Sequence, residues 1–230
     1  MAETKQVAER NTNQKVVEKA KDFWGRNSKI VLIASAAIII FCGGYLAYKY
    51  LVKGPKEDKA VEAMFKAEEY YRLDSLNVAL NGDGINAGFL KIIKNYNGTR
   101  AGNLAKFYAG DIYLKQGNYS NAVKYLKDFS TDSKQIQARA YKLLGDAYAE
   151  QGKNADALDA YKKAAHYFEK DDDNSSEYLF MAAYFADRVM KNQKEAIDLF
   201  KELKEKYSKT QRGFEAEKYL AQLGVYSDTK

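Results

Sequence analysis

The chain has 230 residues, of which 46% are hydrophobic, with one cysteine, one histidine and a formal charge of +6. This composition supports a folded core, and it excludes an internal disulfide and any metal site built from several cysteines and histidines. The first 56 residues hold ten basic and four acidic side chains, whereas residues 57–230 hold 27 of each. A neutral domain lacks the basic face that nucleic acids require, so nucleic-acid binding is not expected.

An apolar segment predicts one transmembrane helix over residues 30–48. The stretch IVLIASAAIIIFCGGYLA, residues 30–47, carries no charge, and with Tyr48 it spans about 28 Å, close to the thickness of a bilayer core. The 29 residues before it, and the lack of a small-residue cleavage motif after it, favour an uncleaved anchor over a signal peptide. Gly43 and Ala47 form a small-residue pair that permits close packing against another membrane helix.

Flanking charges predict the orientation. Five basic residues precede the span within about 15 positions and four follow it, which favours a cytoplasmic N-terminus. We therefore assign residues 1–29 to a cytoplasmic tail and 49–56 to a juxtamembrane linker. Pro55, the only proline, is expected to begin a new helix and not to continue an old one. A repeat domain is assigned to residues 57–226 and a C-terminal tail to 227–230.

Residues 60–80 predict a degenerate first repeat, with Ala79 at a position that must be small. The sequence NGDGIN, residues 81–86, interrupts it before a helix resumes through FLKIIKNY. Asp83 between two glycines, and the acidic run at 171–174, invite comparison with calcium loops. Neither has the alternating ligands and terminal glutamate of an EF-hand, so solvated loops without metal are expected.

Two clear copies of a repeat follow, at residues 103–129 and 138–164. Gly110 and Ala122 are expected to be small because two antiparallel helices touch there, and Gly117 suits a left-handed turn. The pattern G-x-x-Y-x-x-x-G-x-x-x-x-A occurs in both copies, which resemble the tetratricopeptide repeat. The matched pairs are Ala105/Ala140, Gly110/Gly145, Asp111/Asp146, Tyr113/Tyr148, Gln116/Gln151, Gly117/Gly152, Ala122/Ala157 and Lys127/Lys162. The resemblance implies an all-α solenoid of three to four helical hairpins.

A third copy is expected to begin near Glu177, with Ala196, Phe200 and Leu203 on its second helix. It departs from the pattern, since Tyr184 replaces the small glycine and Asp187 replaces the tyrosine. Its two helices are therefore expected to pack at a different distance. EAEKYLAQL, residues 215–223, predicts a closing helix that covers the last apolar face.

The first helices of such hairpins line the inside of a curve, which predicts a groove for peptides or protein partners. Phe107, Met181 and Phe185 fit the core equally well. The inner positions expected from the repeat pattern are Leu104, Phe107, Asp111 and Leu114, then Arg139, Lys142, Asp146 and Glu150, then Tyr178, Met181, Phe185 and Arg188.

Tail, anchor and repeats together resemble the YfgM-type ancillary subunits of the bacterial Sec translocon. The resemblance runs through SKIVLIASAAIIIFCGGYLAYKY, GPKEDKAVEAMFKAEEYY and KIIKNYNGTRAGNLAKFYAGDIYLKQGNYSNAV. It implies an inner-membrane protein with its repeat domain in the periplasm beside the translocon. It also implies work with a membrane-anchored periplasmic prolyl isomerase chaperone on secreted proteins.

Two other functions are considered. One is an assembly scaffold for another envelope complex, such as cell-wall or outer-membrane machinery. The other is an enzyme, for which His166 is the one histidine; no nucleophile or carboxylate partner is specified for it, so no catalytic residue and no cofactor are expected. His166 buried in a cleft against Asp or Glu would favour the enzyme.

Overall fold

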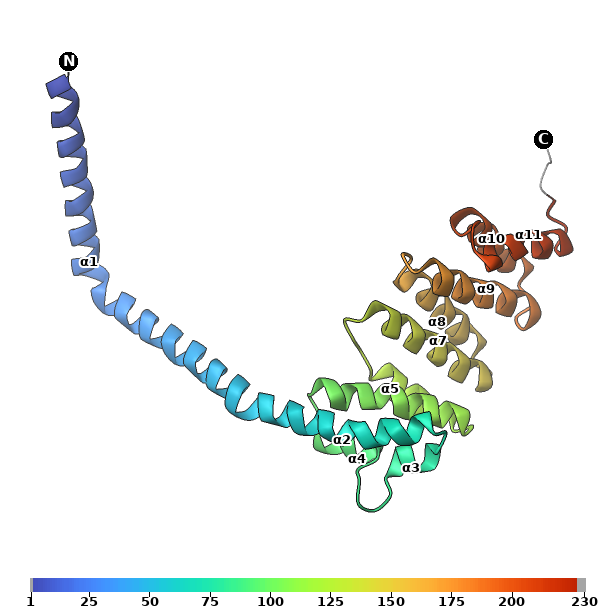
Figure 1. Cartoon of the computed structure of the whole chain (residues 1–230). Coiled ribbons are helices and arrows are strands. Elements are labelled where there is room, and N and C mark those ends of the chain that lie inside the picture. The colour runs from blue at the N-terminus through green and yellow to red at the C-terminus, as the bar shows by residue number, and fades with distance from the viewer. Residues whose placement is uncertain (1, 227–230) are drawn as a thin grey trace. The chain divides into compact units, whose positions relative to one another are not determined.

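A computed structural model describes residues 2–226, and the side chains of residues 17–19 and 21–226 (Figure 1). The predicted tail at 227–230 lies outside the described residues. The chain divides into two compact units, Met1–Pro55 and Lys56–Lys230. The elements are α1 (Ala2–Ala47), the π-helix η1 (Tyr48–Lys53), α2 (Gly54–Arg72), α3 (Leu76–Asn81), α4 (Phe89–Asn95), α5 (Arg100–Lys115), α6 (Tyr119–Lys127), α7 (Lys134–Glu150), α8 (Asn154–Tyr167), α9 (Asp172–Arg188), α10 (Gln193–Lys206) and α11 (Gln211–Gln222).

The predicted membrane segment lies in α1, whose apolar side chains from Leu32 to Leu46 are exposed. Within the described residues this is the one helical run long and apolar enough to cross a membrane, with a mean hydropathy of 2.4 over its best window. The small residues Gly43 and Ala47 are also exposed, and a Cβ added at Gly43 would meet nothing within 4 Å. This surface is open to packing by another helix.

Pro55 does not separate two helices, contrary to expectation. The chain stays helical from α1 through η1 into α2, and the amide of Gly54 donates to the carbonyl of Lys49, five residues back. A π turn is wider than an α turn, which gives the chain room for a proline ring that clashes with a regular helix. The predicted linker at 49–56 is therefore helical.

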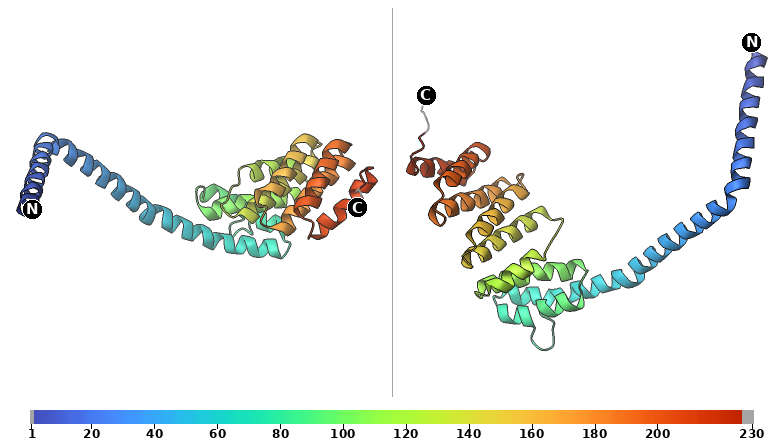
Figure 2. Two further views of the ribbon diagram at one scale, coloured as in Figure 1. Left: turned by 90° about the horizontal axis from the view of Figure 1, so that it is seen from above. Right: turned by 180° about the vertical axis from the view of Figure 1, so that it is seen from behind.

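The second unit consists of helical hairpins packed side by side (Figures 1 and 2). The first pairs α2 with a second helix that is broken into α3 and α4; the others are α5 with α6, α7 with α8, and α9 with α10, and α11 closes the array. Among residues 2–226 no strand forms, and the sole β-type contact is an isolated bridge between Gly82 and Ala87. The predicted all-α hairpin solenoid is confirmed.

The small residues of the repeat lie where they were expected, at the closest approach of two helices. A Cβ on Gly110 would fall 2.6 Å from Cγ of Leu126, and one on Gly145 would fall 2.6 Å from the ring of Tyr161. Ala122 and Ala157, on the second helices of the same hairpins, are fully buried. The glycines at 117 and 152 take φ of +74° and +71°, so both end a helix in the left-handed conformation.

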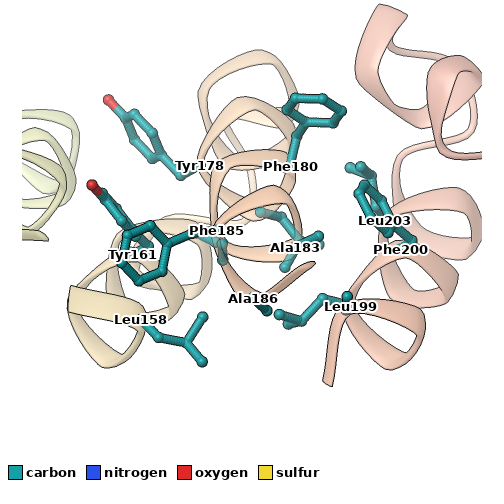
Figure 3. Close-up of a cluster of buried hydrophobic side chains, with 14 of the residues drawn as sticks. Leu158, Tyr161, Tyr178, Phe180, Ala183, Phe185, Ala186, Leu199, Phe200 and Leu203 are labelled. Carbon is teal, nitrogen blue, oxygen red and sulfur yellow. The ribbon is translucent and has the colours of Figure 1, made fainter. Parts of the chain in front are cut away.

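The third copy keeps a small residue at its contact, although it is not at position 184 as the repeat pattern placed it. In the first two copies a backbone amide in the turn donates to the carbonyl five residues earlier, from Asn118 to Tyr113 and from Lys153 to Tyr148. In the third copy the amide of Asn192 donates to the carbonyl of Ala186, six residues earlier. This turn has one extra residue, which shifts the register of α9. The small position is therefore Ala183, which is fully buried near Phe200 (Figure 3).

Candidate functional site

A concave surface of the repeat unit lies between α2 and the start of α5. It has a volume of about 1000 Å³. Val61 and Phe65 lie one turn apart on α2 and are 57% and 61% exposed, although both side chains are large and apolar. The apolar lining consists of Val61, Met64, Phe65, Ala101 and Leu104. We call this surface the α2–α5 groove.

The walls of the groove differ in charge. Lys66 is paired with Glu69 at 2.8 Å, and Glu57 accepts hydrogen bonds from the backbone amides of Arg100 and Ala101 at 2.9 and 3.0 Å. Glu57 thus caps α5 and fixes α2 against it. The polar lining consists of Glu57, Glu62, Lys66 and Glu68 on α2, Asn86 on the loop after α3, and Arg100 on α5.

A second hollow of about 590 Å³ adjoins the groove, because Arg100 and Leu104 line both. Its far side is formed by the connection between α6 and α7 and by Ile136 on α7, which is 36% exposed. The side chain of Asn103 holds this connection by donating to the carbonyl of Ser130 at 2.5 Å. Together the two hollows make an extended surface along the first three hairpins.

Of the twelve inner positions expected from the repeat pattern, Leu104 lines the groove. Phe107, Tyr178 and Phe185 are instead buried in the core, with exposed fractions of 7% and 8%. Phe107 packs against Phe129, and Phe185 packs against Tyr161 with ring centroids 5.5 Å apart (Figure 3). They do not line the predicted surface because the neighbouring hairpin covers the side of the helix on which they lie.

Each of the two repeated aspartates accepts a hydrogen bond from a tyrosine hydroxyl on another helix, Asp111 from the preceding hairpin and Asp146 from its own. Asp111 is 3% exposed, accepts a hydrogen bond from the hydroxyl of Tyr71 and pairs with Lys115 at 2.8 Å. Asp146 accepts from the hydroxyl of Tyr161 at 3.0 Å and pairs with Lys142 at 2.8 Å. Burial, followed by the nearby Asp146 carboxylate, raises the pKa of Tyr161. These contacts explain why both copies carry Asp at this position.

The remaining predicted positions are partly engaged as well. Leu114 and Met181 are partly buried against the core. Arg139 lies over the ring of Phe107, with 5.9 Å from Cζ to the centroid, and Arg188 pairs with Asp187 at 2.9 Å. Glu150 is exposed on α7. Apart from Leu104, none of the twelve lines one of the two hollows, which lie nearer the N-terminal end of the array.

The loop between α3 and α4 is ordered by Asp83 and projects from the array (Figure 1). The Asp83 carboxylate accepts from the amides of Ile85 and Asn86 at 2.8 and 2.6 Å, from the Asn86 side chain, and from the Tyr70 hydroxyl at 2.7 Å. These donors lower the pKa of Asp83, with the Asn86 side chain contributing most. The loop is exposed, as expected, and its carboxylate is occupied by hydrogen bonds from the loop itself and from Tyr70 on α2.

This arrangement predicts that the loop resists acid. A carboxyl whose pKa is lowered on folding contributes stability that is present above its unfolded pKa and is lost as the pH falls through its folded value. The amide resonance of Asn86 is therefore expected to stay at its neutral-pH position through pH 4, the ordinary carboxyl range, and to move only below it. Asp83→Asn is expected to shift the Asn86 amide resonance at all pH values. A change of this resonance with a midpoint near pH 4 in the unmodified chain would contradict the role of Asp83 in ordering the loop.

His166 is not buried in a cleft. Its Nε2 lies 2.8 Å from Glu202, and Glu202 and Glu169 are each 3.0 Å from the ammonium of Lys206. The three potential metal ligands lie within 4.8 Å of one another, but the Lys206 cation already pairs with both carboxylates. Hydrogen bonds to Glu169 and Glu202 raise the pKa of Lys206. The arrangement is that of a surface ion-pair network.

The sequence did not lead us to the exposed groove residues Val61 and Phe65 on α2, or to a second internal repeat. Residues 89–108 match 200–219 as F-x-x-[IL]-x-x-x-Y-x-x-T-x-x-G-x-x-A-x-x-Y. In both places the phenylalanine stacks on the last tyrosine, Phe89 on Tyr108 with centroids 4.9 Å apart and Phe200 on Tyr219 with centroids 5.1 Å apart. Thr99 and Thr210 accept from the amides of Gly102 and Gly213. The pattern was visible in the sequence, offset from the repeat that was recognised.

Comparison with known proteins identifies the repeats. The family model described as "Tetratricopeptide repeat" matches residues 107–176 and 142–209. This stretch, from α5 to α10, therefore consists of tetratricopeptide repeats, which serve as protein-interaction modules. Searches of curated proteins and of solved structures found no match.

Proposed function

We propose that the chain is a membrane-anchored adaptor that binds a protein partner in the α2–α5 groove. The observation that carries the proposal is the exposure of Val61 and Phe65 in a concave surface next to the tetratricopeptide repeats. Large exposed apolar side chains in a hollow are typical of a binding site, since burying them on association is favourable. The apolar part of α1 is the anchor in this proposal, with the N-terminus in the cytoplasm.

We further propose that the adaptor is an ancillary component of the bacterial Sec translocon. In this proposal the repeat unit lies in the periplasm and binds a membrane-anchored chaperone or emerging secreted proteins. The support is the likeness in arrangement: a short N-terminal region, one apolar helix and a repeat unit in that order. In this proposal the exposed pair Gly43 and Ala47 packs against another membrane helix.

A photo-crosslinking experiment in intact membranes tests both proposals. A benzophenone amino acid at position 61 of the full chain is expected to form a discrete adduct, and the same group at position 214 serves as the control. Phe214 is 82% exposed on α11 and lines neither hollow, so it reports random collisions. Sec or chaperone components in the position-61 adduct would support the translocon proposal.

The outcomes separate the broad proposal from the narrow one. Recovery of cell-wall or outer-membrane machinery at position 61 would overturn the translocon assignment and leave the adaptor. Equal labelling at positions 61 and 214, without a discrete adduct, would overturn the groove as the binding surface.

A further inference from the structure

The two walls of the α2–α5 groove carry opposite charges that the fold leaves uncompensated. Glu62 is exposed and has no ion-pair partner among residues 17–226. Glu68 also lines the groove, but it lies about 120° around α2 from Glu62, on the side toward Tyr108 of α5. The hydroxyl of Tyr108 donates to Glu68, and burial together with the charge of Glu68 raises the pKa of Tyr108 to about 12. Lys66, the one lining cation on α2, is neutralised by Glu69. The α2 wall is therefore acidic.

The opposite wall is basic. Arg100 is the charged residue that α5 contributes to the groove lining. It is exposed, and within the described part of the chain its guanidinium forms no ion pair. Its backbone amide is held by Glu57, which fixes the start of α5 while leaving the side chain free.

Between these walls the floor is apolar and about two helical turns long. Val61 and Phe65 are spaced one turn apart along α2, and Leu104 faces them from α5 within the same hollow. An α-helix that lies in an apolar groove contacts it through side chains at i, i+3 or i+4 and i+7. The spacing of the floor residues matches such a pattern.

We propose that the groove binds an amphipathic α-helix of a protein partner whose two flanks carry opposite charges. Its apolar face covers Val61, Phe65 and Leu104. A row of Lys or Arg lies along Glu62, and a row of Asp or Glu lies toward Arg100. The opposite charges of the walls fix the direction in which the helix lies. This inference rests on the proposed adaptor function and names the chemistry of the partner.

The test uses two synthetic peptides of identical composition and the purified full chain in nanodiscs of uncharged lipid. Each peptide has about 15 residues, enough for a stable helix, with leucine along one face. In the segregated peptide all lysines lie on one flank and all glutamates on the other; in the mixed peptide both flanks carry both. Binding is measured by fluorescence anisotropy of a labelled peptide. The equal composition removes differences in affinity for lipid.

The segregated peptide is expected to bind about five- to ten-fold more tightly than the mixed one, as a few partly exposed ion pairs allow. Glu62→Lys and Arg100→Glu are each expected to remove this preference. The double variant Glu62→Lys/Arg100→Glu exchanges the walls, so the segregated peptide is expected to bind again in the reverse direction. Phe65→Ser is expected to abolish binding of both peptides, and Phe214→Ser on α11 is the matched control without effect.

Equal affinity for the two peptides, or a double variant no better than its single variants, would overturn the inference. Loss of binding in the Phe214→Ser control would also overturn it, because binding would then not depend on the groove. If the peptide experiment overturns the inference but position 61 still gives a discrete crosslink in membranes, the adaptor proposal stands. Failure of that crosslink would count against the adaptor proposal itself.

Discussion

Replacing Phe200 by Ala is expected to lower the free energy of unfolding by about 3–5 kcal/mol, the usual range for a fully buried phenylalanine. The Phe200 side chain is 0% exposed and is surrounded by Phe180, Tyr219 and the small face of α9 (Figure 3). The truncation leaves a cavity that the rigid hairpins cannot close. Urea unfolding of the full chain in detergent, followed by circular dichroism, measures the change.

Phe214→Ala is the matched control for this experiment. It removes the same side chain from the neighbouring helix α11, where 82% of it is exposed, and should change the free energy of unfolding by less than about 0.5 kcal/mol. Similar losses in the two variants would show that Phe200 does not form the core as described. A local loss confined to α9–α11 would still agree with a solenoid, in which each repeat contacts only its neighbours.

Gly213→Ala is expected to destabilise the chain, although alanine is the better helix former by about 1 kcal/mol. Gly213 lies in the first turn of α11, and a Cβ at this position would fall 1.8 Å from the carbonyl oxygen of Tyr207. That carbonyl accepts hydrogen bonds from both the amide and the hydroxyl of Thr210, at 2.9 Å each, so it has little freedom to move. We expect a loss of about 3 kcal/mol from this overpacking.

Two further variants accompany Gly213→Ala, one as a parallel case and one as a control. Gly102→Ala is expected to act in the same way, because its Cβ would lie 2.2 Å from the carbonyl oxygen of Tyr96. Ser120→Ala, on the exposed side of α6, is expected to change stability by less than about 0.5 kcal/mol. A gain in stability for Gly213→Ala in the same urea experiment would mean that helix propensity outweighs the close approach.

The sequence was sufficient to predict the hairpins because their contacts repeat. Gly110 and Gly145 mark close approaches to Leu126 and Tyr161, and Ala122 and Ala157 are fully buried, as expected of small positions at helix contacts. The same reasoning misplaced Tyr184, because one extra turn residue before Asn192 shifts the register without changing the pattern of residue types. Sequence spacing alone does not reveal such a shift.

The groove was harder to predict for a different reason. Positions such as Phe107 and Phe185 lie on the inner side of a first helix, but the depth at which the next hairpin covers them depends on its angle and distance. The exposed pair Val61 and Phe65 lies in the degenerate first repeat, where no glycine pattern sets the register. Membrane orientation and the contacts of Gly43 and Ala47 stay predictions, since they depend on partners outside the chain.

The joint shared by α4–α5 and α10–α11 makes the array modular. The same phenylalanine, tyrosine, threonine and glycine connect a second helix to the next first helix at both places. Hairpins bounded by identical joints are interchangeable building blocks, which an engineer can excise or duplicate without designing a new junction. Insertions and deletions of whole hairpins are thus a simple evolutionary route to longer or shorter versions of this scaffold.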